Sequence, residues 1–293
     1  MPELDWDSLL QRIRGGKCTP FLGAGATHGL LPGGDSIARD WAKAEKYPLR
    51  ECDLARVSQF IAVDKGGDAG IPKERMCTLI DEAMRKIQLK QWLSQPDNPI
   101  AVLAELPLPV YLTTNYDNLM FEALRLAGKD PRIELCRWNR AVAKLDSVFD
   151  RKTKFVASPE TPIVYHLHGH ISVPDSLVLT EDDYFDFLLA VAKDEKLLPP
   201  RIGEAISSTS LLFVGYRLAD VNFRVLFRGL ISSMEGVLRK TSVAVQLPPD
   251  NYTAEELKNV QNYLDRYFEQ TKVRVYWGDA GEFMREVRRR FQA

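Results

Sequence analysis

Three of the four histidines of this chain lie close together, in the run Tyr165–His170. If this run is a strand, His166 and His168 share one face of it, because successive side chains alternate. Gly169 then ends the strand, so His168 lies at its carboxyl edge and His166 lies further inside. A neutral imidazole at such an edge can act as a general base or bind a metal ion. The carboxylates that follow have no recognisable ligand spacing, which weighs against a metal site, while a lone histidine at such a place is more often structural.

A second polar group follows the apolar run Val110–Thr113, and it consists of Thr114, Asn115 and Asp117. Ligands of open α/β sheets bind beyond the carboxyl ends of the strands, where these side chains are expected. Asn or Asp at this place can also cap the helix that begins nearby. A cap needs only one of the two residues, so the pair indicates binding as well.

Two glycine-containing turns also follow apolar runs. The first is Gly23-Ala24-Gly25-Ala26 and the second is Val214-Gly215-Tyr216, with Asp220 expected to cap the next helix. Glycine lets a backbone approach a phosphate closely, and exposed amides at such a turn can donate to it. The first turn lacks the full dinucleotide-binding pattern, and glycine-rich turns are common in proteins without ligands, so each turn alone is a weak indication.

Short apolar runs alternate with amphipathic segments along the whole chain. This pattern predicts an α/β fold, a doubly wound Rossmann-like parallel sheet, because strands buried on both faces read as continuous apolar runs. Residues 36–100 are expected to form a mostly helical inserted module, and residues 128–160 and 175–205 further excursions. The expected strands are 19–22, 110–113, 163–167, 211–214, 242–245 and 273–276, and the expected helices include 73–93, 117–127, 219–232, 253–269 and 279–291.

The four polar or glycine-rich turns must lie on one edge of the sheet if its strands are parallel. In their order and spacing they resemble the motifs of the sirtuin superfamily. The Val214–Phe223 stretch resembles the zinc-free, NAD-cleaving branch of bacterial anti-phage defence. The resemblance covers about residues 18–250 and implies a single NAD-binding domain over 1–293, with residues 36–100 as a helical module within it.

The resemblance implies a role for each motif. His168 would be the general base and Asn115 would position a water beside the nicotinamide ribose, while Asp117 would face the nicotinamide carboxamide. His166 is expected to matter less than His168. The cofactor-binding set implied by the resemblance is Gly23, Ala24, Gly25, Ala26, Thr114, Asn115, Asp117, Gly215, Tyr216 and Gln246.

The activity implied is that of an NAD glycohydrolase, which releases nicotinamide and ADP-ribose and depletes NAD during phage infection. The alternatives are an NAD-dependent protein deacylase or ADP-ribosyltransferase, and an NAD or ADP-ribose sensor without turnover. The loop 31–36 lacks the Pro-Asp-Phe-Arg sequence of the deacylases, which weighs against an acyl-lysine channel. The resemblance also implies control by assembly, through a homo-oligomer or a HerA-like ATPase partner.

Composition limits the remaining possibilities. A net charge of -1 argues against direct binding of nucleic acid through a basic surface. The four cysteines are Cys18, Cys52, Cys77 and Cys136, which are too dispersed for a structural zinc site, so we expect no zinc. Neither a signal peptide nor an apolar membrane span is apparent, so a cytoplasmic location is expected.

Overall fold

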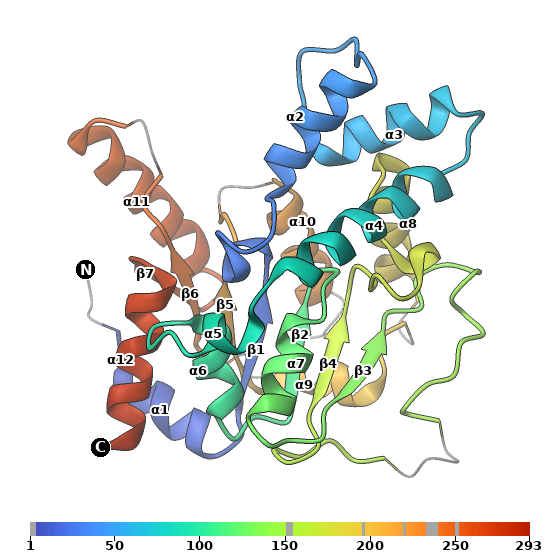
Figure 1. Ribbon diagram of the computed structural model, residues 1–293. Coiled ribbons are helices and arrows are strands. Elements are labelled where there is room, and N and C mark those ends of the chain that lie inside the picture. Colours follow the sequence, from blue (N-terminus) through green and yellow to red (C-terminus); the bar gives the residue numbers. More distant parts are fainter. Residues whose placement is uncertain (1–3, 151–154, 195–196, 219–220, 233–239, 250–251) are drawn as a thin grey trace.

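A single seven-stranded parallel sheet forms the centre of the computed structural model (Figure 1), with the strand order β3-β4-β2-β1-β5-β6-β7. The structure describes residues 4–150, 155–194, 197–218, 221–232, 240–249 and 252–293. The strands are β1 (Cys18–Leu22), β2 (Val110–Thr113), β3 (Arg132–Leu135), β4 (Ile163–His166), β5 (Ser210–Val214), β6 (Ser242–Gln246) and β7 (Val273–Trp277). The predicted α/β fold with a parallel sheet is confirmed.

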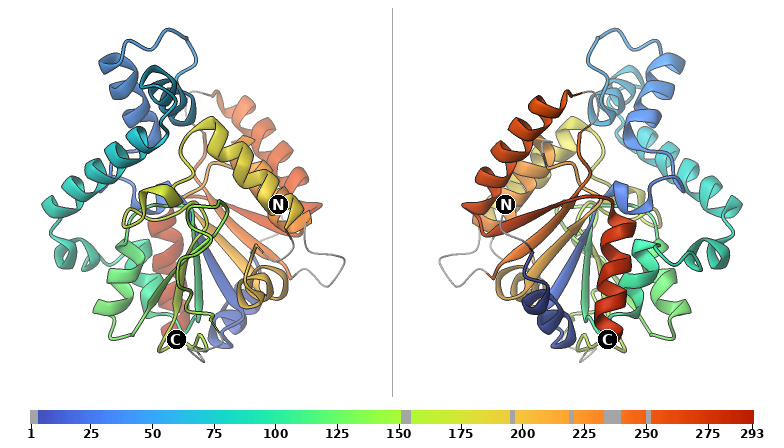
Figure 2. Two further views of the ribbon diagram at one scale, coloured as in Figure 1. Left: turned by 90° about the vertical axis from the view of Figure 1, so that its right-hand side faces the viewer. Right: turned by 90° about the vertical axis from the view of Figure 1, so that its left-hand side faces the viewer.

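Helices cover both faces of the sheet (Figure 2), because successive strand residues send apolar side chains to opposite sides. Phe21 belongs to the core on one face and Leu22 to the core on the other. The first face packs against α8 (Glu181–Lys193), α9 (Pro200–Ser208), α10 (Val221–Ser232) and α11 (Ala254–Glu269). The second packs against α1 (Trp6–Arg14), α6 (Pro99–Glu105), α7 (Leu119–Leu126) and α12 (Ala280–Gln292).

The segment between β1 and β2 is helical, as the sequence predicts, and projects from the sheet edge in Figure 1. Its helices before α6 are α2 (Gly34–Ala44), α3 (Leu54–Asp64), α4 (Gly70–Lys86) and α5 (Leu89–Leu93). The single helix predicted over 73–93 is in fact two, because the backbone at Ile87 is extended. Leu177 and Leu179, which follow β4, complete the core shared by α2, α3 and α4.

Two expectations about the other connections are wrong. The excursion predicted at 128–160 contains the edge strand β3, whose sequence Arg-Ile-Glu-Leu alternates and is not a continuous apolar run. The excursion predicted at 175–205 is the crossover from β4 to β5, and its helices α8 and α9 cover one face of the sheet. A capping box at Thr180 begins α8, and Phe187 and Val191 are its buried side chains on that face. Asp220, the predicted cap, lies outside the described residues.

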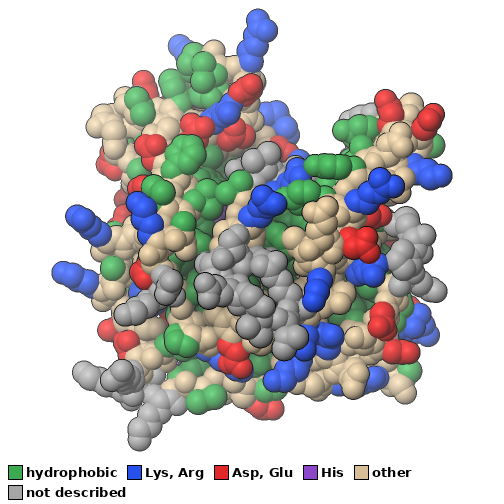
Figure 3. Space-filling model, turned by 180° about the vertical axis from the view of Figure 1, so that it is seen from behind, with side chains coloured by type: hydrophobic (Ala, Val, Ile, Leu, Met, Phe, Trp, Pro, Cys, Tyr) green, Lys and Arg blue, Asp and Glu red, His purple; other side chains and the backbone are tan. Residues whose placement is uncertain are grey.

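The surface has no single dominant charge on the face drawn in Figure 3, where acidic and basic side chains are both spread widely. The four arginines of α12 are paired with acids: Arg285 with Asp97, Arg288 with Glu105, and both Arg289 and Arg290 with Glu286. Among the described helices, none is long and apolar enough to cross a bilayer.

Candidate functional site

The four turns singled out by the sequence lie side by side on one edge of the sheet. The strands before them are neighbours in the order β4-β2-β1-β5, and all pairs are parallel. Backbone hydrogen bonds continue past the strand ends, from Thr114 N to Leu22 O (3.0 Å) and from Gly23 N to Val214 O (2.9 Å). The predicted convergence of these turns is confirmed.

The two glycine turns pack directly against each other. Gly25 N donates to Gly215 O at 2.9 Å, and Gly215 has a φ of +82°. A Cβ on Gly23 would lie 2.7 Å from Gly215 O, and one on Gly215 would lie 2.1 Å from Ala26 N. These glycines are therefore required by backbone contact between the turns, which is a structural reason for them besides the phosphate contact that the sequence suggested. Ala24 and Gly25 remain exposed at the sheet edge.

Tyr216 joins three neighbouring strand ends. Its hydroxyl donates to Leu22 O at 2.8 Å and lies 2.9 Å from Thr114 Oγ1. Its ring packs against Phe21 and Phe223, with centroids 5.5 and 4.8 Å away. Burial raises the pKa of the phenol, so the group stays protonated. Both Thr114 and Tyr216 thus hold the edge together as well as lining it.

Asn115 is oriented by three hydrogen bonds. Its amide Nδ2 donates to Gly23 O at 3.2 Å, its backbone N donates to Thr113 Oγ1 at 2.9 Å, and its carbonyl oxygen lies 2.9 Å from His166 Nδ1. Because Nδ2 donates to Gly23 O, the orientation of the side-chain amide is fixed, and Oδ1 is left to accept a hydrogen bond. Asn115 is half-buried, so a ligand at the edge can reach it.

Asp117 is the residue of this motif that stabilises the start of a helix. Its Oδ1 accepts from Leu119 N, in the first turn of α7, at 2.9 Å. The side chain is buried, and desolvation raises the pKa of the carboxyl to about 6. The capping alternative therefore applies to Asp117, and its raised pKa lets it exchange a proton near neutral pH.

His168 is buried beneath α8. Its ring meets Tyr184 and Phe187 edge to face, with centroids 5.4 and 5.0 Å away, and only 7% of the residue is exposed. Desolvation lowers the pKa of the imidazole to about 3, so it is neutral at physiological pH. Its Nε2 is buried with no hydrogen-bond partner among the residues described. His168 does lie at the carboxyl edge of β4, as predicted, but the sequence gave no sign that α8 covers it.

The loop that carries His168 is fastened to the Asn115 turn. Tyr116 Oη donates to Val178 O at 2.6 Å, and Val178 N donates to His168 O at 3.0 Å.

The other two histidines of the run are also buried. His166, as predicted, lies inside the strand and is fully buried. His170 Nδ1 lies 2.8 Å from Ser172 Oγ.

Gln246 stands apart from the other predicted site residues. It ends β6, two strands from β1 in the sheet order. Its Oε1 accepts from Leu218 N at 2.7 Å, and its Nε2 donates to Leu247 O at 2.6 Å. Gln246 thus holds the turn after β5, and the structure does not bring it to the Asn115 turn.

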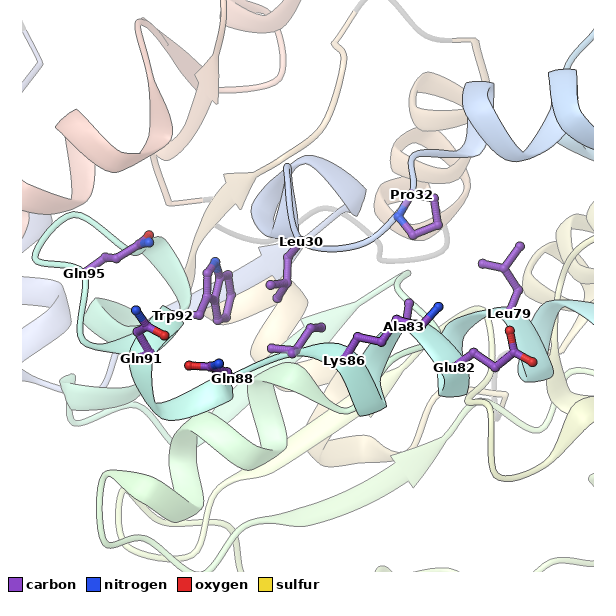
Figure 4. A pocket seen from close by; sticks show the side chains of 11 residues that line it. Leu30, Pro32, Leu79, Glu82, Ala83, Lys86, Gln88, Gln91, Trp92 and Gln95 are labelled. Carbon is purple, nitrogen blue, oxygen red and sulfur yellow. The ribbon is translucent and has the colours of Figure 1, made fainter.

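A cavity of about 600 Å³ lies beside the first glycine turn (Figure 4). One wall is the loop that follows the turn, through Leu30 and Pro32, and the other is formed by α4 and α5. The lining from these helices and the residues at their ends is Leu79, Glu82, Ala83, Lys86, Ile87, Gln88, Gln91, Trp92 and Gln95. The sequence analysis singled out none of these helix residues. The one available signal was an aromatic residue, Trp92 of α5, with Gln91 in the same helix and Gln88 and Gln95 beside its two ends.

The described part of the chain contains no group of three or more His, Cys, Asp or Glu side chains that could hold a metal ion. Cys18 and Cys136 are buried free thiols, and burial raises the pKa of each to about 12.

A comparison with known families matches the SIR2-like domain over residues 109–276, more than half of the chain. The chain belongs to the SIR2-like domain family. The matched range of this SIR2-like chain contains Thr114, Asn115, Asp117, His168, Gly215, Tyr216 and Gln246. It leaves out the first glycine turn and the whole helical insertion at 36–100, so their assignment depends on the structure and the motifs.

The chain is also similar to curated proteins that are each named NAD(+) hydrolase ThsA. The protein of Enterococcus faecium is 26% identical over 281 residues, which are 93% of this chain and 52% of the relative. That of Acinetobacter baumannii (strain 532279) is 25% identical over 254 residues, 83% of this chain and 46% of the relative. That of Bacillus cereus (strain MSX-D12) is 27% identical over 186 residues, 64% and 33%. The chain therefore spans about half or less of the length of these relatives.

Proposed function

We propose that this chain is an NAD glycohydrolase that cleaves the nicotinamide–ribose bond to give nicotinamide and ADP-ribose. One observation carries the proposal: Asn115 and the neutral imidazole of His168 follow adjacent parallel strands, β2 and β4, within a SIR2-like domain. The names of the relatives, NAD(+) hydrolase, support the same chemistry.

The leaving group determines what the residues must do. Nicotinamide departs as a neutral molecule from a cationic pyridinium, so a strong general acid is not needed. The developing oxocarbenium ion requires an oriented nucleophile and a base, as in glycoside hydrolysis. Asn115 Oδ1 would accept a hydrogen bond from the attacking water, because Nδ2 is already bound to Gly23 O. Asp117 would face the carboxamide of nicotinamide.

His168 would accept a proton from the water or from a ribose hydroxyl. Burial keeps it unprotonated at neutral pH, and the buried Nε2 has no hydrogen-bond partner among the described residues. A pKa of about 3 also makes it a weak base in the substrate-free chain, so the role requires substrate binding to raise that pKa. Tyr184 and Phe187 of α8 must shift for a substrate to reach this nitrogen. Active sites often complete their hydrogen bonds only when substrate is bound, so the substrate-free burial is consistent with this role.

The test is chromatography of NAD incubated with the purified chain, with nicotinamide and ADP-ribose as the products measured. Asn115→Ala and His168→Ala should each lower kcat by about 10²-fold or more, the typical contribution of a positioned base or water. His168→Gln keeps most of the buried volume and separates loss of the base from loss of packing. Asn262→Ala, an exposed Asn on α11, is the matched control and should cleave like wild type. Wild-type rates in Asn115→Ala would overturn the assignment.

The same assay separates the alternatives. Hydrolysis with NAD alone supports a glycohydrolase, whereas a requirement for an acyl-lysine peptide would indicate a deacylase. Label transferred from NAD to protein would indicate an ADP-ribosyltransferase. Binding of NAD with no products at any protein concentration, with or without the HerA-like ATPase, would indicate a sensor and overturn the proposal.

We also propose that the activity serves anti-phage defence and is controlled by assembly, as homo-oligomer or with a HerA-like ATPase. An ungated NAD-cleaving enzyme would deplete its own cell, so control is necessary. The loop from Leu30 to Asp35 connects the glycine turn to α2, and neighbours that order this loop would share its entropic cost. Light scattering and specific activity over a dilution series, with and without the ATPase, test this. A monomer with constant specific activity that the ATPase does not change would overturn it.

A further inference from the structure

The four turns of the candidate site contain very little positive charge. A pyrophosphate carries two negative charges, and cations or amide donors must balance them. The segments 23–34, 113–118 and 166–173, which form three of the four turns, contain neither Lys nor Arg. The fourth turn, 214–218, contains Arg217. Within the four turns, Arg217 is therefore the basic side chain that could bind a phosphate.

The amides of the first glycine turn do not replace that charge. Gly23 N donates to Val214 O at 2.9 Å, Gly25 N donates to Gly215 O at 2.9 Å, and Ala26 N donates to Gly23 O at 3.0 Å. Three of the donors expected to cradle a phosphate are thus directed at protein carbonyl groups. A phosphate at the exposed residues Ala24 and Gly25 needs a further donor.

Arg217 lies where such a donor is needed, but it is paired with a carboxylate. Its Nη1 is 2.9 Å from Asp35 Oδ2, and the two side chains are 78% and 64% exposed. Gly25 packs on Gly215, two residues before Arg217, and the loop after Gly25 leads to Asp35 at the start of α2. Asp35 follows one glycine turn along the chain and Arg217 follows the other. The ion pair therefore joins the two segments that come directly after the contact between these turns. Exposed ion pairs are weak, and a phosphate can bind guanidinium through two parallel hydrogen bonds where Asp35 is held through Nη1.

We propose that Arg217 binds the pyrophosphate of the substrate, and that Asp35 competes with the substrate for Arg217 in the free protein. This inference rests on the proposed function, since it assigns a residue to the pyrophosphate of NAD. The two members of one ion pair then have opposite effects. Loss of Arg217 removes a phosphate ligand, whereas loss of the Asp35 charge frees that ligand. A pair that only held the loop in place would give effects of the same sign.

The experiment measures the dissociation constant of ADP-ribose by calorimetry, and the KM for NAD, on the full 293-residue chain. Arg217→Ala should weaken ADP-ribose binding and raise KM about tenfold, the effect of one charge-assisted hydrogen bond. Asp35→Asn should strengthen binding and lower KM about two- to fivefold, which is what a surface ion pair contributes. Inhibition by nicotinamide, which has no phosphate, should be unchanged in both variants.

A matched control is the pair Arg85–Asp81 on α4, with an Nη2–Oδ2 distance of 2.6 Å and side-chain exposures of 77% and 50%. Arg85→Ala and Asp81→Asn should leave ADP-ribose binding unchanged. Shifts of the same sign in Arg217→Ala and Asp35→Asn, or shifts no larger than in the controls, would overturn the inference.

The outcomes distinguish this inference from the proposed function. ADP-ribose binding with opposite shifts, in a chain that does not cleave NAD with or without the ATPase, would support Arg217 and overturn the glycohydrolase. NAD cleavage with shifts of the same sign would support the glycohydrolase and overturn the role of Arg217. A chain that neither binds ADP-ribose nor cleaves NAD would overturn both.

Discussion

His166 Nδ1 lies 2.9 Å from the carbonyl oxygen of Asn115, in the turn that follows the neighbouring strand. A carbonyl oxygen only accepts, so Nδ1 carries the proton in this bond. His166 pairs with Thr113 in the register of β2 and β4, two residues before Asn115. The fully buried side chain of His166 in β4 thus fixes the backbone of Asn115, a candidate catalytic residue that follows the neighbouring strand β2.

His166→Ala should therefore be more harmful than the sequence alone predicts. The change leaves the Asn115 carbonyl without its partner and opens a cavity in the sheet, which together should lower the free energy of unfolding by about 2–4 kcal/mol. NAD cleavage should fall as Asn115 loses its orientation. His166→Asn places an amide donor near the position of Nδ1 and should recover part of both losses. Urea unfolding and kcat measure these effects, and unchanged values in His166→Ala would contradict the positioning role.

The sequence predicted those parts of the fold that depend on local pattern. Continuous apolar runs identified six of the seven strands, and parallel pairing then required Gly23, Asn115, His168 and Gly215 to follow strands on one edge. The strand that was missed, β3, is half-exposed at the sheet margin, so its pattern is alternating and resembles a loop.

What the sequence could not predict depends on contacts between distant segments. The burial of His168 follows from Phe187 and Tyr184 of α8, which nothing in the local sequence connects to a histidine. Contact between Gly25 and Gly215 likewise links residues far apart in the chain. The Arg217–Asp35 pair is a third such contact.

Gly25→Ala should disrupt the contact between the two glycine turns. A Cβ at Gly25 would lie 2.9 Å from Gly215 Cα, and backbone on both sides leaves little room for relaxation. We expect a loss of about 1–3 kcal/mol in the free energy of unfolding, the usual cost of overpacking, with reduced NAD cleavage. Gly33→Ala is the matched control, because Gly33 has a φ of −71° and its Cβ would meet no atom within 4 Å. Thermal unfolding that is equal in the two variants would show that the turns do not pack as described.

Lys73 and Asp183 connect the helical insertion to the helix that covers His168. Lys73 Nζ lies 2.7 Å from Asp183 Oδ1, and the side chains are 7% and 9% exposed. Asp183 Oδ2 also accepts from the backbone amides of Leu179 and Thr180, at 3.1 and 2.9 Å. This buried pair holds α4 against the beginning of α8.

Lys73→Met should lower the free energy of unfolding by about 3–5 kcal/mol, because it leaves a buried carboxylate without its counter-charge. Lys73→Met with Asp183→Asn should be less destabilised than Lys73→Met alone, since the uncompensated charge is gone. Urea unfolding of the two single variants and the double variant gives the coupling energy. A coupling energy near zero would mean that the insertion and α8 are held together by other contacts.

Stability should fall steeply in mild acid because three buried histidines resist protonation in the folded chain. Desolvation is the first cause in each case, and it lowers the pKa of His166 and His168 to about 3 and that of His170 to about 4. An unfolded histidine titrates near 6.5, so between about pH 6.5 and 4 the unfolded chain binds protons that the folded chain does not. By linkage, the free energy of unfolding decreases as the pH falls through this window.

Asp117 acts in the opposite direction, and this gives the sharpest test. Its folded pKa of about 6 exceeds the usual value of 3.8, so between these pH values the folded chain holds a proton that the unfolded chain has lost. Its contribution therefore decreases as the pH rises. Three histidines against one carboxyl leave about two protons taken up on unfolding, a slope of about 3 kcal/mol per pH unit near pH 5. Urea unfolding between pH 4.5 and 7.5 should show His168→Gln flattening this slope by about 1.4 kcal/mol per pH unit and Asp117→Asn steepening it by a similar amount. Equal slopes in wild type and both variants would show that neither side chain is buried in solution as the fold places it.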